Sequence, residues 1–165
     1  MEEKKRNETR PVRGVEYSKT EQIQIVMPES INGSGRLFGG KLLEWIDVVA
    51  AVVARRHSGS NVTTACIDQL IFKQGAYVND MLVLIGRVTW VGRTSMEIRV
   101  DTYVEDPDGM RRPINRAYLV MVAVDEKGKA VPVPELAVQT EAERAEWGNG
   151  VKRNELRRER RQQGY

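Results

Sequence analysis

The sequence predicts an α+β fold in which a strongly bent antiparallel β-sheet wraps around one long central helix. Residues 41–57 have helical periodicity and are apolar on nearly every face, and such a helix is buried in a core or enclosed by a sheet. Segments rich in β-branched residues follow it, at 62–72, 81–90, 95–104 and 111–124. A small open sheet cannot cover this helix all round, so the sheet is expected to bend around it.

The strands and turns are indicated by local patterns. Residues 21–27 alternate polar and apolar side chains, which is typical of a half-buried strand, and Pro28 ends it. Residues 95–104 alternate in the same way, as an antiparallel strand with one wet face does. The sequence Asp-Pro-Asp-Gly at 106–109 favours a turn. A bent sheet leaves edge strands that a second copy would cover, so a dimer is the expected minimum.

Three segments are predicted along the chain. Residues 1–19 are polar and are expected to be a flexible N-terminal segment, and 20–139 form the folded domain. Residues 140–165 are expected to be a charged helical tail, in one or two exposed pieces broken at 148–150, where the sequence is Gly-Asn-Gly.

Composition indicates a cytoplasmic protein that does not enter a membrane. No apolar run approaches the roughly 20 residues that span a bilayer, and the N-terminus lacks the apolar stretch of a signal peptide. Cys66, the single cysteine, fits a reducing compartment. The net charge is +3, but residues 152–165 hold six basic and two acidic side chains and contribute +4. Nucleic-acid binding is therefore not favoured, because the body is nearly neutral.

Histidine- and metal-based catalysis is disfavoured. His57, the only histidine, follows Arg55 and Arg56 at the polar end of the predicted helix, where a solvated role is expected. No metal-ligand spacing, phosphate-binding loop or serine nucleophile motif is found, so no metal or cofactor is predicted. Catalysis would have to rest on carboxylates, amides and backbone donors.

With histidine- and metal-based catalysis disfavoured, Asp47 is the main candidate for a catalytic residue. It lies within an otherwise apolar stretch of the helix, where an ionised carboxylate is costly unless paired or at a cleft. Its position alone fits two roles equally. One is a structural carboxylate tied to a partner at a dimer interface, and the other is a catalytic residue that acts as general base or nucleophile. The loop that holds Asn32, Gly39 and Gly40 runs directly into the helix, whose N-terminal N–H groups could stabilise an oxyanion. Plain turn geometry also explains these glycines.

Three motifs resemble a known family. The run from Met27 to Asp47, MPESINGSGRLFGGKLLEWID, is similar to the hot-dog acyl-CoA thioesterases of the cytosolic acyl-CoA hydrolase group, in their short bacterial single-domain form. The runs from Arg87 to Met96 and from Arg116 to Asp125 match further motifs of that family in order and spacing. The resemblance extends over residues 22–135 and implies a hot-dog domain at 20–139.

The resemblance also implies a function and a site. It implies hydrolysis of acyl-CoA by Asp47, as general base or nucleophile, with Asn32 of a second protomer and the amides of Gly39 and Gly40. It implies a homodimer with the active site at its interface, commonly assembled as a trimer of dimers. Substrate contacts are implied for Phe38, Gly92, Arg93, Thr94 and Ser95, with coenzyme A near the 91–95 turn. The sequence departs from the family pattern at Gly75 and 78–80, in a connecting loop and not at Asn32 or Asp47, and these changes bear on substrate preference. A non-catalytic acyl-CoA-binding protein is the alternative.

Overall fold

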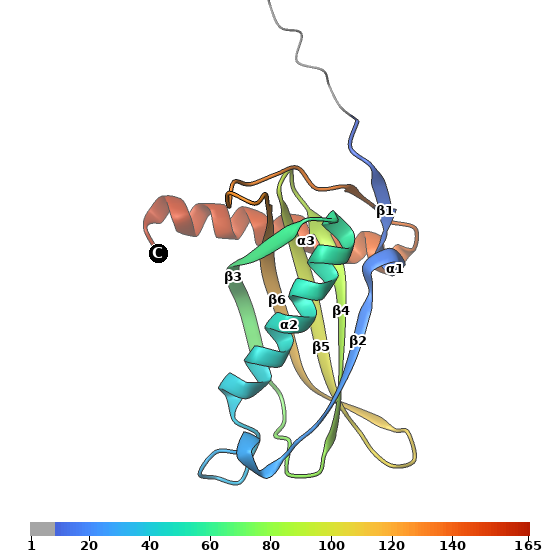
Figure 1. The fold of residues 1–165 in the computed structure, drawn as a ribbon, viewed down its shortest axis with the longest axis vertical. Helices are drawn as coiled ribbons and strands as arrows, with labels where there is room; N and C mark the ends of the chain where they lie inside the picture. The colour runs from blue at the N-terminus through green and yellow to red at the C-terminus, as the bar shows by residue number, and fades with distance from the viewer. Residues whose placement is uncertain (1–8) are drawn as a thin grey trace, which may run out of the picture.

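The computed structural model describes residues 9–165, and its main element is one curved antiparallel sheet of five strands (Figure 1). The strand order is β2-β4-β5-β6-β3. The bounds are β2 Thr20–Ile25, β3 Asn61–Phe72, β4 Met81–Val91, β5 Ser95–Glu105 and β6 Arg111–Val124. A short 3₁₀ helix, η1 Pro28–Ser30, lies in the loop after β2.

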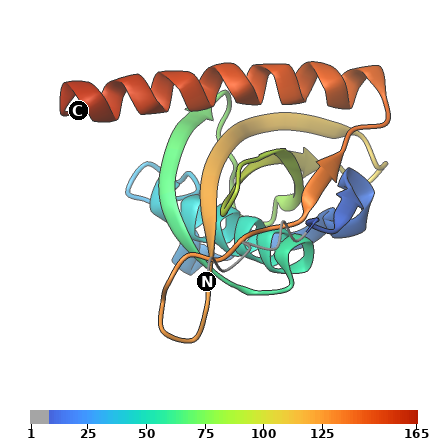
Figure 2. The ribbon, with the colours of Figure 1, turned by 90° about the horizontal axis from the view of Figure 1, so that it is seen from above.

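Helix α2, Gly39–Ser58, lies against the concave face of this sheet (Figures 1 and 2). Its residues Ile46, Val49 and Val53 are completely buried. The helix approaches β4 so closely that a Cβ atom at Gly86 would lie 2.7 Å from Val49 Cγ1. Only glycine fits this contact, since real Cβ atoms do not approach a neighbour so closely. The predicted helix wrapped by a bent sheet is confirmed.

The sheet does not cover α2 all round. Glu44, Val48 and Arg55 are exposed, and Asp47 and Ala51 are half-buried. These positions recur every three or four residues, so they form one open stripe along the helix. Val48 and Ala51 make part of the stripe apolar, as is typical of a surface that another molecule covers.

Helix α3, Glu141–Gln163, packs across the convex face of the sheet (Figure 2). The predicted break at 148–150 is wrong, because the helix runs through these residues without interruption. Gly150 sits directly on Trp90, where a Cβ atom would lie 2.7 Å from Trp90 Cβ. The cost of about 1 kcal/mol for a glycine within a helix is therefore offset by close packing on the sheet.

Buried ion pairs hold α3 in place, so the prediction of an exposed tail is wrong for this part of it. Arg153 and Arg157 both bind Glu97 of β5, each at 2.8 Å, and the Glu97 side chain is fully buried. Arg157 also binds Asp68 of β3 at 2.9 Å, as does Arg160. Much of the basic charge in the tail is thus paired with carboxylates of the sheet.

The N-terminal segment is ordered from Val12 onward. Strand β1, Val12–Gly14, pairs in parallel with β7, Glu135–Ala137, and the short helix α1, Val15–Ser18, follows β1. The predicted flexibility of residues 1–19 is wrong for 12–18, while 1–8 lie outside the described residues. Elements of three or four residues are too short to show a period, which is why the sequence did not reveal them.

His57 is completely buried, so the prediction that it is solvated is wrong. Its Nε2 atom lies 3.2 Å from the carbonyl oxygen of Pro134, and its Nδ1 atom is buried without a hydrogen-bond partner. Burial lowers the pKa of His57 from 6.5, although the contact with Pro134 acts in the opposite direction, and the charge of Arg13 lowers it further. The folded protein therefore favours the neutral imidazole.

We expect His57 to make stability depend on pH. Its pKa is lower in the folded chain than the unfolded value of 6.5, so this stability is complete above pH 6.5 and is lost as pH falls below it, by at most about 1.4 kcal/mol per pH unit. Urea unfolding of the wild type and of His57→Gln between pH 8 and 5.5 measures it. The variant should show a flatter profile below pH 6.5, and parallel profiles would contradict the assignment to His57.

Candidate active site

The loop before α2 fixes the orientation of the Asn32 amide. The Oδ1 atom of Asn32 accepts hydrogen bonds from the backbone N–H groups of Ser34, at 2.9 Å, and Arg36, at 3.2 Å. Its Nδ2 atom donates to no residue that the structure describes, and Asn32 is exposed. The amide is thus held by its oxygen and presents its N–H groups to a ligand, as a donor and not an acceptor.

The start of α2 offers two further donors. The N–H groups of Lys41 and Leu42 bond to the Phe38 carbonyl, and Phe38 provides no side-chain cap. Gly39 and Gly40, the first two helical residues, have N–H groups with no acceptor among the described residues. Such groups at a helix N-terminus attract negative charge.

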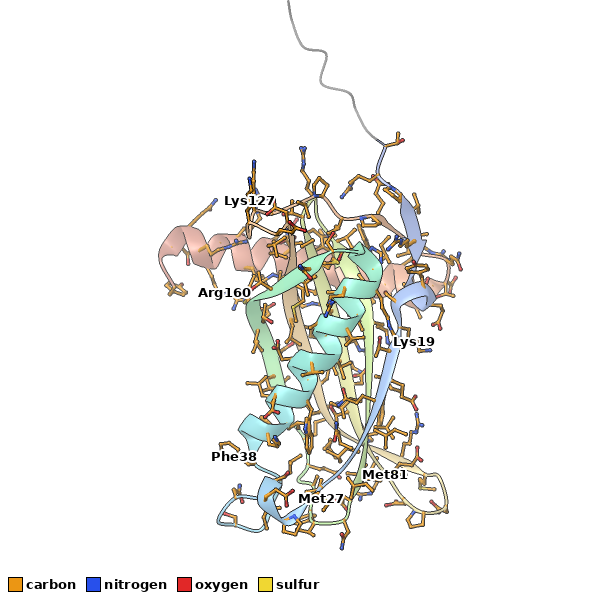
Figure 3. All side chains as sticks on the ribbon, viewed as in Figure 1. Lys19, Met27, Phe38, Met81, Lys127 and Arg160 are labelled. Carbon is orange, nitrogen blue, oxygen red and sulfur yellow. The ribbon has the colours of Figure 1, made fainter. Side chains whose placement is uncertain are left out.

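Two phenyl rings lie beside these glycines. A Cβ atom at Gly40 would lie 2.5 Å from Cε1 of Phe38, and one at Gly39 would lie 3.4 Å from Cζ of Phe72. Phe38 is 56% exposed and projects at the N-terminal end of α2 (Figure 3). The backbone donors therefore lie beside apolar rings, where a hydrogen bond to a ligand is stronger than in open water.

Asp47 lies in the open stripe of α2 and is paired with a residue that the sequence did not single out. The hydroxyl of Thr64 on β3 donates a hydrogen bond of 2.7 Å to Oδ1 of Asp47. This bond fixes the carboxylate and leaves its second oxygen, Oδ2, without a hydrogen bond from any described residue. A carboxylate held in this way is suited to accept a proton or to attack an electrophile.

Two β-bulges let β3 present side chains to both helices. The register of β3 against β6 shifts between Thr64 and Cys66 and again between Ile67 and Gln69, so that Ala65 and Asp68 are extra residues. Without bulges, Thr64 and Asp68 would face the same side, because strand side chains alternate. In the structure Thr64 faces α2 while Asp68 faces α3. The sequence did not single out Thr64, because its contact with Asp47 joins residues 17 positions apart.

Within one chain, the backbone donors at the start of α2 lie well along the helix from Asp47. Asp47 lies eight residues beyond Gly39 in α2, which is about 12 Å along a helix axis. No hydrogen bond joins Asn32 to Asp47 among residues 9–165. One protomer therefore presents the amide donors and the carboxylate at separate points of its surface.

The predicted coenzyme A contacts lie at the other end of α2. Gly92 donates its N–H to the Ser95 carbonyl at 2.8 Å in the turn between β4 and β5, and Thr94 accepts from Ala123. Arg93 is exposed and lines a cavity of about 820 Å³ that Ser58, at the C-terminus of α2, also borders. Arg10 and Arg13 lie on the wall of this cavity, as does Glu135. Arg10 and Arg13 donate to backbone carbonyls, whereas the guanidinium of Arg93 has no hydrogen bond to a described residue and is suited to a phosphate.

The described part of the chain holds no group of three or more histidine, cysteine, aspartate or glutamate side chains that could bind a metal ion. None of its helices is long and apolar enough to cross a membrane.

Comparison with known proteins decides the family. The profile of the thioesterase superfamily matches residues 34–110. A Bacillus subtilis protein named as an uncharacterized acyl-CoA thioester hydrolase is 36% identical over 154 residues, which cover 93% of this chain and 90% of that protein. This chain belongs to the thioesterase superfamily. The human cytosolic acyl coenzyme A thioester hydrolase is 31% identical to this superfamily member over 82% of the chain, which spans only 37% of the human protein.

Solved structures of thioesterases have the same fold. A hexameric acyl-CoA thioesterase in its apo form superposes with a TM-score of 0.87 at 43% identity, covering 91% of this chain and 97% of that one. The acyl-CoA hydrolase of Staphylococcus aureus, in complex with butyryl coenzyme A and coenzyme A, gives 0.88 at 30% identity, covering 93% and 94%. The predicted hot-dog fold and the predicted family are confirmed.

Proposed function

We propose that this protein hydrolyses acyl-CoA to a free acid and coenzyme A, with Asp47 at the centre of the reaction. The observation that carries the proposal is the 2.7 Å hydrogen bond between Thr64 and Asp47. Structures of the Staphylococcus aureus hydrolase include variants in which an asparagine, an aspartate and a threonine are replaced by alanine. Those positions are separated by fifteen and seventeen residues, as are Asn32, Asp47 and Thr64.

The reaction needs no metal or cofactor. Asp47 removes a proton from water while the water oxygen bonds to the thioester carbonyl carbon. The carbonyl oxygen becomes an oxyanion, to which Asn32 Nδ2 and the N–H groups of Gly39 and Gly40 donate. The carbon–sulfur bond then breaks, and the coenzyme A sulfur leaves with the electron pair and takes the proton. In the alternative route, a carboxylate oxygen of Asp47 bonds to the carbonyl carbon, the carbon–sulfur bond breaks as coenzyme A leaves as its thiolate, and water hydrolyses the resulting anhydride to restore Asp47.

A second copy completes this site. Strand β3 is a free edge of the sheet, and Ile67, Ile71 and Phe72 on it are 40 to 51% exposed. Together with the open stripe of α2, this edge is the surface that we propose pairs two protomers. Such pairing would bring Asn32 and Gly39 of one chain to Asp47 of the other. A trimer of such dimers is the proposed assembly, in line with the hexameric thioesterase that this fold resembles.

The coenzyme A moiety is proposed to bind along the 91–95 turn. Phe38, Gly92, Arg93, Thr94 and Ser95 remain the proposed substrate contacts, and the arginine-lined cavity beside Arg93 gives the phosphates a cationic wall. The proposed compartment is the cytoplasm.

Release of free thiol from a panel of acyl-CoAs tests the proposed activity. Purified protein is expected to release thiol at a rate proportional to its concentration. The alternative, a protein that binds acyl-CoA without cleaving it, predicts saturable binding with no thiol release. Binding alone would therefore overturn the proposed hydrolysis.

Subunit exchange tests the shared site. Asn32→Ala and Asp47→Ala proteins are each expected to be inactive, while a mixture of the two should recover up to about a quarter of wild-type activity. Random pairing makes half of the dimers mixed, and each mixed dimer has one intact site of two. Native mass spectrometry verifies the exchange. No recovery despite verified exchange would place both residues in one protomer's site.

A further inference from the structure

The turn between β4 and β5, residues 92–94, has its carbonyl groups bonded within the protein. The carbonyl of Arg93 accepts a hydrogen bond from the N–H of Val133 at 2.9 Å. That of Thr94 accepts from the N–H of Ala123 at 3.0 Å. The N–H groups of Arg93 and Thr94 themselves have no acceptor among residues 9–165. Successive backbone N–H groups in a turn form a concavity that binds anions.

Arg10, from the N-terminal part of the chain, holds the remaining carbonyl of this turn. Its Nη1 atom donates to the Gly92 carbonyl at 2.7 Å and to the Val133 carbonyl at 3.2 Å. Its Nη2 atom binds Glu135 at 3.2 Å, and the Arg10 side chain is only 29% exposed. Because a guanidinium is a planar fork of donors, it can hold several acceptors in a fixed arrangement. One side chain therefore ties the turn to the segment before β7.

The backbone that carries Arg10 is itself anchored. We call residues 10–14 the N-terminal strap. Its strand β1 pairs with β7, and Arg13 donates to the His57 carbonyl at 2.6 Å, near the C-terminus of α2. A basic side chain on the last carbonyls of a helix is a favourable contact. Arg10 thus reaches the turn from a fixed position.

We infer that Arg10 is a positioning residue, which turns the N–H groups of Arg93 and Thr94 toward the phosphates of a bound coenzyme A. The carbonyl oxygen and the N–H hydrogen of one trans peptide plane point in opposite directions. By holding the Gly92 carbonyl, Arg10 therefore sets the direction of the Arg93 N–H. The inference rests on the proposed function, because it takes coenzyme A to bind at the 91–95 turn.

Kinetics on two substrates test this role. Arg10→Met keeps a long side chain without donors. With butyryl-CoA it should raise KM about tenfold and leave kcat within about twofold, because binding is lost equally in the ground state and the transition state. Butyryl-pantetheine has the same thioester and no phosphate, so its kcat/KM should change by less than about twofold. A loss on both substrates, or on neither, would overturn the inference.

Two further variants accompany Arg10→Met. Arg10→Lys keeps the charge but not the fork of donors, and should raise KM for butyryl-CoA by about threefold. It decides by the same comparison of substrates if Arg10→Met does not fold. Arg111→Met is the matched control, because Arg111 binds Glu105 at 2.6 Å at the opposite end of β5 from the turn. Its kinetic constants should match those of the wild type on both substrates.

Hydrogen exchange followed by mass spectrometry separates positioning from simple attraction of charge. In the ligand-free protein, the Gly92 N–H is bonded to the Ser95 carbonyl at 2.8 Å. The peptide that contains this turn should exchange severalfold faster in Arg10→Met than in the wild type, and at the wild-type rate in Arg111→Met. Weaker coenzyme A binding with unchanged exchange would show that Arg10 acts only through its charge, and would overturn the inference.

Calorimetry with coenzyme A itself separates the role of Arg10 from the proposed reaction. Arg10→Met should weaken the Kd of coenzyme A about tenfold, as expected for lost hydrogen bonds to a charged group. This result without any thiol release from acyl-CoA by the wild type would retain the role of Arg10 and reject the hydrolysis. An unchanged Kd would reject the role of Arg10 while the hydrolysis stands.

Discussion

Replacing Asp47 with asparagine is expected to lower kcat for thiol release by about a thousandfold, since a positioned general base contributes about 10²- to 10⁴-fold. Asparagine keeps the size of the side chain, and its Oδ1 can still accept the hydrogen bond that Thr64 donates at 2.7 Å. The variant loses only the ability to take a proton or to attack the carbonyl. KM should change little, because the amide still fills the place of the carboxylate.

Two further variants provide kcat values with which that of Asp47→Asn is compared. Thr64→Val removes the hydroxyl that orients Asp47 and should lower kcat by about tenfold, a loss of one hydrogen bond to a charged group. Glu16→Gln is the matched control, because Glu16 is an exposed carboxylate on α1 that pairs with Lys19 and lies outside the proposed dimer surface. It should retain full activity. Equal kcat values for Asp47→Asn and Glu16→Gln would exclude Asp47 as the catalyst.

The sequence predicted the features that depend on residues close together in the chain. The apolar faces of the central helix and the strand alternation predicted a sheet wrapped around a helix, and the structure confirms it. The Asn32–Gly40 loop was recognised because its glycines adjoin the helix start. The role of this loop in catalysis stays a prediction. The sequence did not predict its geometry, in which the amide oxygen of Asn32 already accepts two backbone hydrogen bonds.

What the sequence missed depends on contacts between distant residues. His57 has polar neighbours in the chain, yet Pro134 covers it from 77 positions away. The Gly-Asn-Gly run in α3 suggested a break because its packing partner, Trp90, lies on another element. Thr64 of β3 meets Asp47 of α2 through a contact between residues 17 positions apart.

Replacing Arg157 with methionine is expected to lower the free energy of unfolding by about 3 kcal/mol, the lower end of the range for breaking a buried ion pair. Arg157 is 7% exposed and lies between Asp68, at 2.9 Å, and Glu97, at 2.8 Å. Removing its charge leaves both buried carboxylates with one cation fewer. The loss stays near the lower end because Arg153 still binds Glu97 and Arg160 still binds Asp68.

Arg158→Met provides the control, because Arg158 is exposed on the same helix and forms no ion pair with a described residue. Its effect should be within about 0.5 kcal/mol. Urea unfolding gives both values, and equal midpoints for the two variants would show that the charges under α3 contribute nothing. If the prediction holds, α3 stabilises β3 through Asp68, four residues from Thr64 on the strand that carries it. The helix that looked like a solvated tail would then be part of the framework of the site.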